Sequence, residues 1–583
     1  MPRTETVSEY LIDRLAAVGA ERIYGIIGDS LNPVTDALRR DGRLDWVHVR
    51  HEEAGAFAAG AEAQLTGKLA VCAGSSGPGN LHLINGLYDA HASAAPVLAI
   101  ASQITIPELG SEFHQETHPE RLYRECSDWC ELISSAEQFP RALHMAIQSA
   151  LANRSVSVIV VPGDIAAQDL PDGGWRSHFA SRQPTMMPAA EDLDRLVELI
   201  EASERPMIFS GIGAAPATEA ILELAERIGA PVGYSFRGKD HFQADNPQEV
   251  GMTGLLGFGG AYQAMHECDL LILAGTDFPY RGFLPSDVKA VQIDIRGERL
   301  GRRMPLELGV IADAGETARA VLARVAEKQD RSFLEEQRKD HKRQVEKLQG
   351  YVEHVSSQHP IHPEYVAARL DQLADDDAVV TLDTGMTTVW GARYMHGSGG
   401  DRGRRFLGSF RHGSMANALP QAIGAQLAEP EKQVVSMCGD GGLTMLLGDL
   451  LTLVQEELPV KVVVFNNGVL GMVRLEMQVA GLVDFETELK SPDFAALGRA
   501  CGMHGILVER RDEVDDGLRE LLAHDGPAIC DVRTDPEALS MPPKISLDQA
   551  QGFALSMIKK SLDGHIDEVL STAKTNIRNV PRP

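Results

Sequence analysis

Residues 434–472 read VVSMCGDGGLTMLLGDLLTLVQEELPVKVVVFNNGVLGM, the stretch with the strongest structural signal in this chain. One apolar run ends at GDGG (439–442), a helical stretch follows, and a second apolar run ends at NN (466–467). Apolar runs that alternate with helical stretches are typical of βαβ units with parallel strands. Asp440 and Asn467 then both follow the carboxyl ends of parallel strands, where open α/β sheets bind their ligands.

The residue types at this sheet edge predict a site for a diphosphate and Mg²⁺. Glycines let the backbone approach phosphate oxygens closely. The Asp440 carboxylate, the Asn467 side-chain oxygen and the Val469 carbonyl are hard ligands of the kind Mg²⁺ prefers, and they leave positions for diphosphate oxygens and water. The alternative is a glycine-rich turn with an aspartate helix cap, followed by an asparagine turn. The spacing and the flanking strands together favour the metal site.

Composition indicates an ordinary globular protein. The 583 residues predict three or four domains, and 44% are hydrophobic and 24% charged. The formal net charge of −28 argues against nucleic acid as a partner. Seven cysteines are scattered, so reduced thiols are expected. Because the sequence shows neither a secretory signal nor about 20 consecutive apolar residues, we expect a cytoplasmic protein.

The alternation of apolar and helical stretches recurs in three segments, which predicts an α/β protein with three doubly wound parallel-sheet domains and a C-terminal helical tail. A stretch containing Pro, Gly and Ser separates the first two segments and is interpreted as a linker. Strands are expected at 22–27, 69–74, 97–102, 156–161, 206–211, 268–275, 290–295, 378–383, 434–440, 461–467 and 527–532. The expected units are 1–180, 190–330, a charged connector without a wide apolar face at 331–361, 362–535, and the tail at 536–583.

GDGG and NN closely resemble the diphosphate motif of thiamin-diphosphate enzymes, and the resemblance covers nearly the whole chain. It is carried by YGIIGDSLN (24–32), VRHEEAGAFAAGAEAQLTGKLAVCAGSSGPGNLHLINGLYDAH (49–91), RGKDH (237–241), GMTGLLGF (251–258), GTDFPYR (275–281) and LGSFRHGSMANALPQAIGAQ (407–426). These strings are similar to the pyruvate oxidase family, and most similar to its quinone-linked pyruvate dehydrogenase branch. The resemblance implies pyrimidine-binding, FAD-binding and diphosphate-binding domains, with thiamin diphosphate, Mg²⁺ and FAD as cofactors.

The resemblance also assigns three catalytic residues. Thiamin chemistry needs a carboxyl group in a dry pocket, bonded to N1′ of the aminopyrimidine, and Glu52 in VRHEE matches it. The alternative for Glu52 is a first-turn carboxylate favoured by the helix dipole, an interpretation that suits Glu53 better. His82 either donates to a substrate carboxylate or relays protons, or is a structural histidine. Gln115 matches a glutamine on the substrate side.

The remaining thiamin contacts follow from the same match. Met415 corresponds to the apolar side chain that holds the cofactor in a bent V shape, whereas a helical methionine usually packs in a core. Residues implied to contact thiamin diphosphate are Glu52, Ser76, Gly413, Ser414, Met415, Asp440, Gly441, Gly442, Asn467, Gly468, Val469, Leu470, Gly471, Met472 and Val473. The metal ligands expected are Asp440, Asn467 and Val469.

The flavin prediction depends on resemblance, because GIGAAP (211–216) is only a broken GxGxxG turn. Arg237 and Arg281 are expected to neutralise the FAD diphosphate, and Asp294 to accept hydrogen bonds at a strand end. The alternative is a degenerate nucleotide domain that keeps its fold. The residues implied to bind FAD are Arg237, Thr253, Gly254, Leu255, Leu256, Thr276, Asp277, Phe278, Pro279, Tyr280, Arg281 and Asp294.

The resemblance implies oxidative decarboxylation of pyruvate, or a close 2-keto acid, to acetate and CO₂, with electrons passing to FAD and then to a quinone. His114 and Ala94-Ala95 depart from the family pattern near the expected reacting centre, which leaves the exact substrate open. The alternatives are a carboligase of the acetolactate synthase type with structural FAD, a phosphate- and oxygen-dependent pyruvate oxidase, and a noncatalytic scaffold. Intact Glu52, Asp440 and Asn467 argue against the scaffold.

The tail has two open interpretations. Ile558, Leu562, Ile566, Val569, Leu570, Ala573 and Ile577 form an apolar stripe at helical spacing. The stripe either packs on its own protein or, with Lys559 and Lys560 beside it, docks peripherally on the inner face of the cell membrane. The resemblance further implies a homo-oligomer, a dimer or tetramer, in which the cofactor lies between two subunits.

Overall fold

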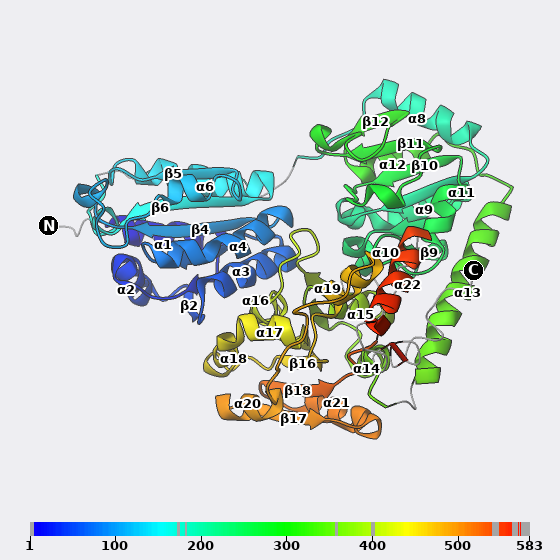
Figure 1. The fold of residues 1–583 in the computed structure, drawn as a ribbon. Coiled ribbons are helices and arrows are strands. Elements are labelled where there is room, and N and C mark those ends of the chain that lie inside the picture. Colours follow the sequence, from blue (N-terminus) through cyan, green and yellow to red (C-terminus); the bar gives the residue numbers. More distant parts are fainter. Residues whose placement is uncertain are drawn as a thin grey trace.

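The computed structural model describes residues 5–171, 175–180, 184–355, 359–397, 403–538, 547–562, 569–570 and 572. These residues form three six-stranded sheets whose neighbouring strands all pair in parallel (Figure 1). The predicted fold class is therefore confirmed. In Figure 1 the first domain lies at the left in blue and cyan, the middle domain at the upper right in green, and the third domain below in yellow and orange.

The first sheet has the strand order β2-β1-β3-β4-β6-β5. Its strands are β1 (Arg22–Gly25), β2 (Asp45–His48), β3 (Ala70–Gly74), β4 (Val97–Gln103), β5 (Trp129–Leu132) and β6 (Val156–Pro162). Its helices are α1 (Val7–Val18), α2 (Asn32–Asp41), α3 (Glu52–Thr66), α4 (Pro78–Ala92), α5 (Pro119–Leu122), α6 (Phe139–Asn153) and α7 (Gly163–Ala166). The four inner strands include β3, β4 and β6, which are buried along their whole length, as expected for parallel strands covered on both faces.

The middle sheet has the order β12-β11-β10-β7-β8-β9. Its strands are β7 (Pro206–Ser210), β8 (Val232–Tyr234), β9 (Glu249–Met252), β10 (Leu270–Ala274), β11 (Lys289–Asp294) and β12 (Leu308–Ile311). Its helices are α8 (Ala190–Ala202), α9 (Thr218–Ile228), α10 (Lys239–Phe242), α11 (Ala261–Glu267) and α12 (Ala314–Leu322). Counted from the first strand of this domain, the order is that of dinucleotide-binding folds, and it reverses between β7 and β10.

The third sheet, β14-β13-β15-β16-β18-β17, repeats the topology of the first. Its strands are β13 (Val379–Leu382), β14 (Arg405–Gly408), β15 (Val434–Gly439), β16 (Lys461–Asn466), β17 (His504–Val508) and β18 (Ala528–Arg533). Its helices are α14 (Pro363–Leu373), α15 (Met386–Tyr394), α16 (Ala418–Ala428), α17 (Asp440–Met445), α18 (Leu450–Gln455), α19 (Gly471–Val479), α20 (Phe494–Cys501) and α21 (Val514–Ala523). The strand order reverses between β13 and β15, which places the expected ligand crevice at their carboxyl ends.

Small residues join the first and third domains. Helix α3 is rich in alanine and buried on all sides, and it packs against α16 and α4. The two helices approach so closely that a Cβ added at Gly424 of α16 would lie 2.0 Å from the carbonyl oxygen of Ala58 in α3. The Ala- and Gly-rich composition of both helices is therefore a requirement of this contact.

We expect Gly424→Ala to lower the free energy of unfolding by about 1–3 kcal/mol or more, because overpacking forces the two helices apart. Gly350→Ala is the matched control, since a Cβ at Gly350 meets nothing within 4 Å and alanine is favoured over glycine within a helix. Thermal melting of both variants checks the prediction. A Gly424→Ala protein as stable as the wild type would contradict the described α3–α16 contact.

The connector is more buried than its charge pattern predicts. It forms the long helix α13 (Ser332–Val355), as expected, which runs along the middle and third domains (Figure 1). Tyr351 and Val355 are buried in the core shared by these domains, and Val345 and Leu348 pack against it. The apolar stripe is narrow and spread over many turns, so the expectation of a solvated connector is corrected to a helix with one buried edge.

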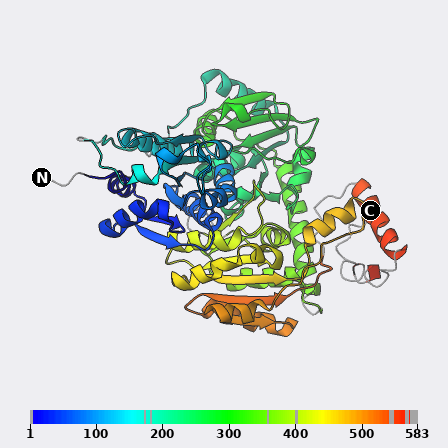
Figure 2. The ribbon, with the colours of Figure 1, turned by 60° about the vertical axis from the view of Figure 1, so that its left-hand side comes forward.

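Helix α22 (Leu547–Leu562) is the described part of the tail and packs on α19 (Figures 1 and 2). The Ser556 hydroxyl donates to the carbonyl oxygen of Leu482 at 2.6 Å, and the Lys559 ammonium to that of Gly481 at 2.8 Å. Lys560 is 2% exposed and pairs with Asp484. Both lysines therefore contact their own chain, and among the described residues only Lys560 is neutralised by a carboxylate. Docking of the tail on a membrane stays a prediction.

The apolar stripe of the tail is only partly described. Ile558 is 57% exposed and Leu570 62% exposed, so neither packs in a core of this chain. The side chains of Leu562, Ile566, Ala573 and Ile577 lie outside the described residues. No described helix is long and apolar enough to cross a bilayer.

The ion pair of Lys560 gives the docking of α22 a pH dependence. Burial raises the pKa of Asp484, but the Lys560 hydrogen bond and the Arg474 charge outweigh burial, so the net shift is downward. The contact therefore stabilises the docked helix above the ordinary carboxyl pKa of about 4 and loses that contribution as pH falls through the lowered value.

We expect Lys560→Met to make amide exchange in α22 at least about tenfold faster at pH 7, because removing one partner of a buried pair costs several kcal/mol and about 1.4 kcal/mol is tenfold. Acidification of the wild type below pH 4 should have the same effect. Lys559→Met is the control, since its partner is a backbone carbonyl. Equal exchange in all three proteins would show that the ion pair does not hold α22.

Candidate active site

A cavity of about 80 Å³ opens at the switch point of the third sheet. It lies where β13, β15 and β16 end, as the spacing of GDGG and NN predicts. Of the residues expected to contact thiamin diphosphate, those that line it are Met415, Asp440, Gly441, Gly442, Asn467, Val469, Leu470, Gly471, Met472 and Val473. Gly439 of GDGG also lines it, and the lining residues that the sequence interpretation missed are Pro363, Thr384, Gly385, Met386, Thr387, Trp390, Phe465, Thr534, Asp535 and Ala538.

Asp440 is the first residue of α17 and is buried. Its Oδ2 accepts hydrogen bonds from the Gly468 backbone N–H at 2.9 Å and from the Ser491 hydroxyl at 2.5 Å. Burial raises the pKa of Asp440, and these hydrogen bonds oppose the rise. The carboxylate is thus held in a fixed orientation at the cavity wall.

The two asparagines of NN have different environments. Asn466 is buried, and its amide donates to Asp531 Oδ1 at 3.0 Å, which is a structural contact. Asn467 lines the cavity, and its Oδ1 accepts from the Val469 N–H at 3.0 Å. The three expected metal ligands, Asp440, Asn467 and Val469, therefore surround one cavity. This set of hard oxygens suits Mg²⁺ as a partial shell that diphosphate oxygens complete.

The glycines of GDGG are required for different reasons. A Cβ at Gly442 would lie 1.8 Å from Oδ2 of Asp383, so no larger residue fits there. A Cβ at Gly439 meets nothing within 4 Å, so this glycine leaves space at the cavity wall. Gly441 packs against Leu489, Leu470 and Met415. The cradle thus has the open backbone that a phosphate group needs.

Asp383 is a site residue that the sequence interpretation missed. It directly follows β13, and its carboxylate accepts the Thr384 N–H at 2.9 Å. Burial raises its pKa to about 7, against hydrogen bonds from the backbones of Thr384, Ala416, Asn417 and Gly439. This one buried carboxyl group therefore accepts hydrogen bonds from three loops around the cavity. The sequence does show DTG (383–385) directly after an apolar run. An aspartate at the end of a strand has many other roles, however, so this pattern alone does not indicate a site residue.

Gly413 and Ser414 do not line this cavity. Gly413 has a φ of +77°, which favours glycine. The Ser414 hydroxyl accepts from the Asn85 amide of the first domain at 2.8 Å, and its N–H donates to Ser409 Oγ at 2.9 Å. Gly468 also lies behind the lining, where its N–H holds Asp440.

The catalytic candidates of the first domain form a second cluster. Glu52 begins α3, and its side chain is 7% exposed. Its Oε2 lies 2.9 Å from Nδ1 of His82, within hydrogen-bonding distance. The rings of His82 and His51 stack with centroids 4.2 Å apart. Burial lowers the pKa of His51, and the neighbouring His82 adds to that effect.

Ser76 and Gln115 lie side by side near this cluster. The Ser76 hydroxyl donates to Oε1 of Gln115 at 3.3 Å, and its N–H donates to Ser30 Oγ at 3.0 Å. Gln115 has a φ of +63°, a left-handed conformation that is uncommon for a non-glycine residue. His114 precedes it on the same exposed turn. Ala94, the other departure from the family pattern, also has a positive φ, +57°.

The structure does not bring the two clusters into one cavity. Every residue that lines the 80 Å³ cavity belongs to the third domain or to the segment 534–538 that follows β18. Glu52, Ser76, His82 and Gln115 are absent from that lining. A single described chain therefore holds two half-sites.

The middle domain has its own site at the β7–β10 switch point. Gly211 and Gly213 approach the backbone of Gly275 so closely that a Cβ at either would lie within 2.8 Å of the Gly275 carbonyl oxygen. Gly254 has a φ of +101° and packs against Phe278 and Tyr280. The expected FAD residues 253–256 and 276–281 are therefore brought together. Asp294 ends β11, and its Oδ1 accepts the Arg296 N–H at 2.9 Å.

Arginines gather beside this switch point, though not all at the expected positions. Arg237 is partly buried and donates to the Ser93 carbonyl oxygen at 2.7 Å, and burial with the nearby Arg411 lowers its pKa to about 10. Asp277 pairs with Arg302, Arg303 and Arg411, so its carboxylate is already engaged. Arg281 is exposed on the surface. The members of this arginine cluster are Arg237, Arg299, Arg302, Arg303 and Arg411.

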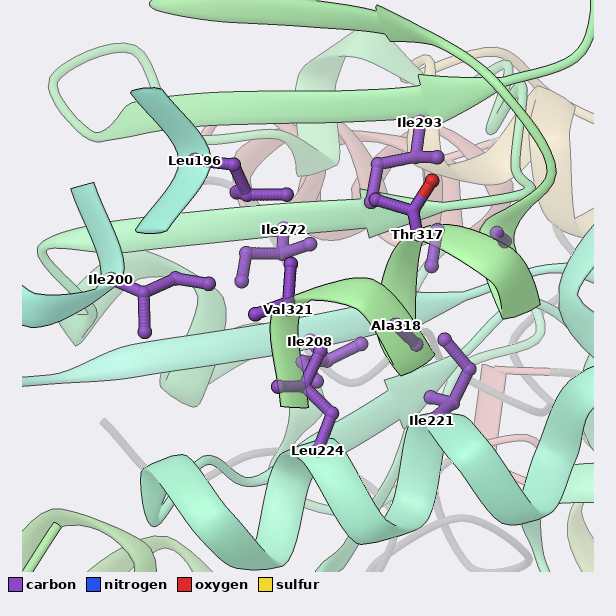
Figure 3. Close-up of a pocket in the computed structure, with 12 residues that line it drawn as sticks. Leu196, Ile200, Ile208, Ile221, Leu224, Ile272, Ile293, Thr317, Ala318 and Val321 are labelled. Carbon is purple, nitrogen blue, oxygen red and sulfur yellow. The ribbon is translucent and has the colours of Figure 1, made fainter. Parts of the chain in front are cut away.

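A second, smaller cavity in the middle domain is a packing defect. Figure 3 shows it surrounded by apolar side chains, with the Thr317 hydroxyl among them. Its volume of about 10 Å³ barely holds one water molecule, and a water needs several polar partners. It is therefore no ligand site.

Comparison with known proteins accounts for the three domains together. The chain matches the thiamine pyrophosphate enzymes: the N-terminal TPP binding domain over residues 5–122, the central domain over 193–321 and the C-terminal TPP binding domain over 383–532. The chain belongs to this thiamin-diphosphate enzyme family. Its two half-sites thus fall in the two TPP binding domains, and the arginine cluster lies mainly in the central one.

Individual relatives of this thiamin-diphosphate enzyme differ in activity. It is 36% identical over 575 residues to YdaP of Bacillus subtilis, which is named as a thiamine pyrophosphate-containing protein, covering 98% of this chain and 99% of the relative. It is 30% identical over 555 residues to pyruvate oxidase of Lactiplantibacillus plantarum, covering 93% and 91%. It is 30% identical over 542 residues to the large subunit of acetolactate synthase isozyme 2 of Escherichia coli, covering 91% and 95%. The enzyme is thus of the decarboxylase and carboligase family, whose typical substrates are 2-keto acids.

Proposed function

We propose that this enzyme oxidatively decarboxylates pyruvate, or a close 2-keto acid, and passes the electrons to FAD and then to a quinone. Pyruvate and water give acetate, CO₂, two protons and two electrons, which FAD takes up. The observation that carries the proposal is the arginine cluster beside the dinucleotide-type switch point. Burial and the neighbouring arginines lower the pKa of Arg237 and Arg411. The carboxylates that oppose this effect, Asp89 and Asp277, are fewer than the five arginines, so the cluster offers complementary charge to an anion such as a dinucleotide diphosphate.

The thiamin half of the proposal assigns roles to residues of both half-sites. When bound, thiamin diphosphate supplies the acidic carbon that attacks a 2-keto acid and stabilises the carbanion left by CO₂. Asp440, Asn467 and the Val469 carbonyl would hold Mg²⁺ and through it the diphosphate. Glu52 would hold a proton at N1′ from its dry position, and His82, in contact with it, would orient that carboxyl group.

The polar groups of the middle domain fit the proposed binding of FAD. Buried Thr253 Oγ1 and Ser210 Oγ have no hydrogen-bond partner among the described residues, and both lie in segments at this switch point. A bound nucleotide can satisfy such groups. Asp294 lies at the carboxyl end of β11, on the edge of the middle sheet where open α/β sheets bind their ligands. The diphosphate role expected of Arg281 fits Arg411 better, because Arg411 lies within the cluster.

We predict that the active enzyme is at least a dimer, because the two half-sites do not meet within one chain. A second subunit can supply Glu52 and His82 opposite the first subunit's Asp440. Sedimentation velocity combined with activity across a dilution series checks this. Full activity in a monomeric fraction would refute it.

Anaerobic mixing with pyruvate tests the proposed function. Bleaching of the flavin absorbance, with one acetate formed per flavin reduced, is expected. Release of CO₂ with acetolactate and no bleaching would instead identify a carboligase with structural FAD. Acetyl phosphate and peroxide formed with phosphate and oxygen would identify the oxidase. Reoxidation of the bleached enzyme by a soluble ubiquinone analogue, faster than by oxygen, would support the quinone acceptor.

A further inference from the structure

A group of buried ionisable side chains lies behind the thiamin cavity, and the proposed function does not use it. His362 precedes α14, and Glu364 lies in the first turn of that helix. Both side chains are 1% exposed. Asp535 follows β18 and lines the cavity itself. These three residues therefore extend from the cavity wall into the interior.

The imidazole of His362 lies between the two carboxyl groups. Its Nδ1 is 3.7 Å from Oε2 of Glu364, and its Nε2 is 3.8 Å from Oδ2 of Asp535. Hydrogen bonds to nitrogen are about 2.7–3.2 Å long, so a ring shift of less than about 1 Å makes either bond. The same shift lengthens the other contact. The ring is thus placed to bond one carboxyl group at a time.

Several groups of this cluster lack hydrogen-bond partners among the described residues. They are Nδ1 of His362, both carboxyl oxygens of Glu364 and the hydroxyl of Tyr351. Buried polar groups without partners cost free energy and are rare in native proteins, so each needs an explanation. Replacement of such buried ionisable groups by apolar side chains of similar volume is often neutral or stabilising. A role in proton transfer would explain why these polar groups of His362, Glu364 and Tyr351 are buried here without hydrogen-bond partners among the described residues.

The inner end of the cluster faces the middle domain. The ionisable groups around Glu364 that come from α13 and α15 are Tyr351, Arg393 and Tyr394. Burial and the Glu364 charge both raise the pKa of Tyr351. Arg393 Nε donates weakly to the Leu256 carbonyl at 3.5 Å, in the loop assigned to the flavin. The cluster of Asp535, His362 and Glu364, together with Arg393, therefore extends from the thiamin cavity to the middle domain.

We propose that Asp535, His362 and Glu364 form a proton relay between the thiamin cavity and the middle domain. An O–H bond of Asp535 breaks as an N–H bond forms at Nε2, and the N–H bond at Nδ1 breaks as an O–H bond forms on Glu364. Reversal of the ring's tautomer resets the relay, and no electrons move. The inference builds on the proposed function, in which protons leave the thiamin site and enter the flavin site.

The test compares His362→Gln and Glu364→Gln with the wild type, all loaded with thiamin diphosphate, Mg²⁺ and FAD. Glu364→Gln keeps the shape of the side chain but cannot carry the proton onward. His341→Gln is the matched control, because the His341 side chain on α13 is only 12% exposed and its Nδ1 also lacks a partner among the described residues. CO₂ release and anaerobic flavin bleaching are measured in H₂O and D₂O, with pyruvate or another 2-keto acid that the wild type decarboxylates.

We expect both relay variants to slow at least one of the two rates by about tenfold or more, within the range for acid–base groups. The solvent isotope effect should change, while thiamin affinity, flavin content and melting temperature are maintained. Rates within twofold of the wild type would overturn the relay. Slow rates with an unchanged isotope effect and a matching loss of thiamin affinity or stability would also overturn it, since they show a structural role. If the wild type does not bleach, the oxidoreductase proposal fails, and CO₂ release alone decides the relay.

Discussion

Replacement of Glu52 by glutamine is expected to leave both cofactors bound and to remove nearly all turnover. The carboxyl group sits at the first position of α3 with its side chain 7% exposed, in contact with His82. Glutamine keeps the shape and the contact with His82 but cannot exchange a proton with N1′. Loss of a positioned acid–base group typically costs about 10²- to 10⁴-fold in rate.

Steady-state decarboxylation, with thiamin and flavin content measured on the same samples, checks this expectation. Glu53→Gln separates the acid–base role from a simple helix-dipole effect, because Glu53 is also in the first turn of α3. Its carboxylate accepts the Asn85 amide at 2.7 Å and does not contact His82 in the described hydrogen bonds. We expect Glu53→Gln to keep most of the turnover. A Glu52→Gln enzyme within a few-fold of the wild type would exclude Glu52 from catalysis.

The strands that the sequence predicts correctly are all inner strands of their sheets. All eleven apolar runs named from the sequence become strands, among them β3, β4 and β15. The strands that were missed include all six at the sheet edges, β2, β5, β9, β12, β14 and β17. Inner parallel strands are buried on both faces and are therefore continuously apolar. Edge strands such as β5 are half solvated, so their mixed sequence resembles a loop.

The sequence predicts those parts of the candidate site whose residues lie close together along the chain. GDGG and NN indicate a cavity at one sheet edge because each string directly follows a strand. Asp383 could not be found this way, because its partners at Ala416, Asn417 and Gly439 come from distant segments. The arginine cluster is similar, since Arg237 and Arg411 are brought together only by packing of the middle and third domains. Such contacts between domains leave no local pattern in the sequence.

Replacement of Asp440 by alanine is expected to abolish tight binding of thiamin diphosphate while flavin content stays unchanged. Asp440 provides the only carboxylate among the three expected Mg²⁺ ligands. Loss of an outer-shell partner of a metal ligand already costs about 10- to 100-fold in metal affinity, so loss of the ligand itself should cost more. The flavin site lies in another domain and should not respond.

Calorimetric titration with thiamin diphosphate and Mg²⁺ measures the effect directly, and thermal shifts provide a second readout. A ligand at 100 times its Kd stabilises the folded state by about 2.7 kcal/mol, a gain that the wild type should show and Asp440→Ala should lack. Ser491→Ala serves as the graded control, because it removes the hydroxyl that donates to Asp440 Oδ2 but keeps the carboxylate. We expect it to weaken binding far less.

The two variants together separate ligation from folding. If Asp440 acts only as the N-terminal residue of α17, its loss should lower the melting temperature of the cofactor-free protein and leave thiamin affinity nearly intact. If it is a ligand, the cofactor-free protein should melt close to the wild type, because burial already disfavours the charged carboxylate and raises its pKa. Unchanged thiamin affinity in Asp440→Ala would therefore remove Asp440 from the metal site, and with it the interpretation of GDGG as a diphosphate cradle.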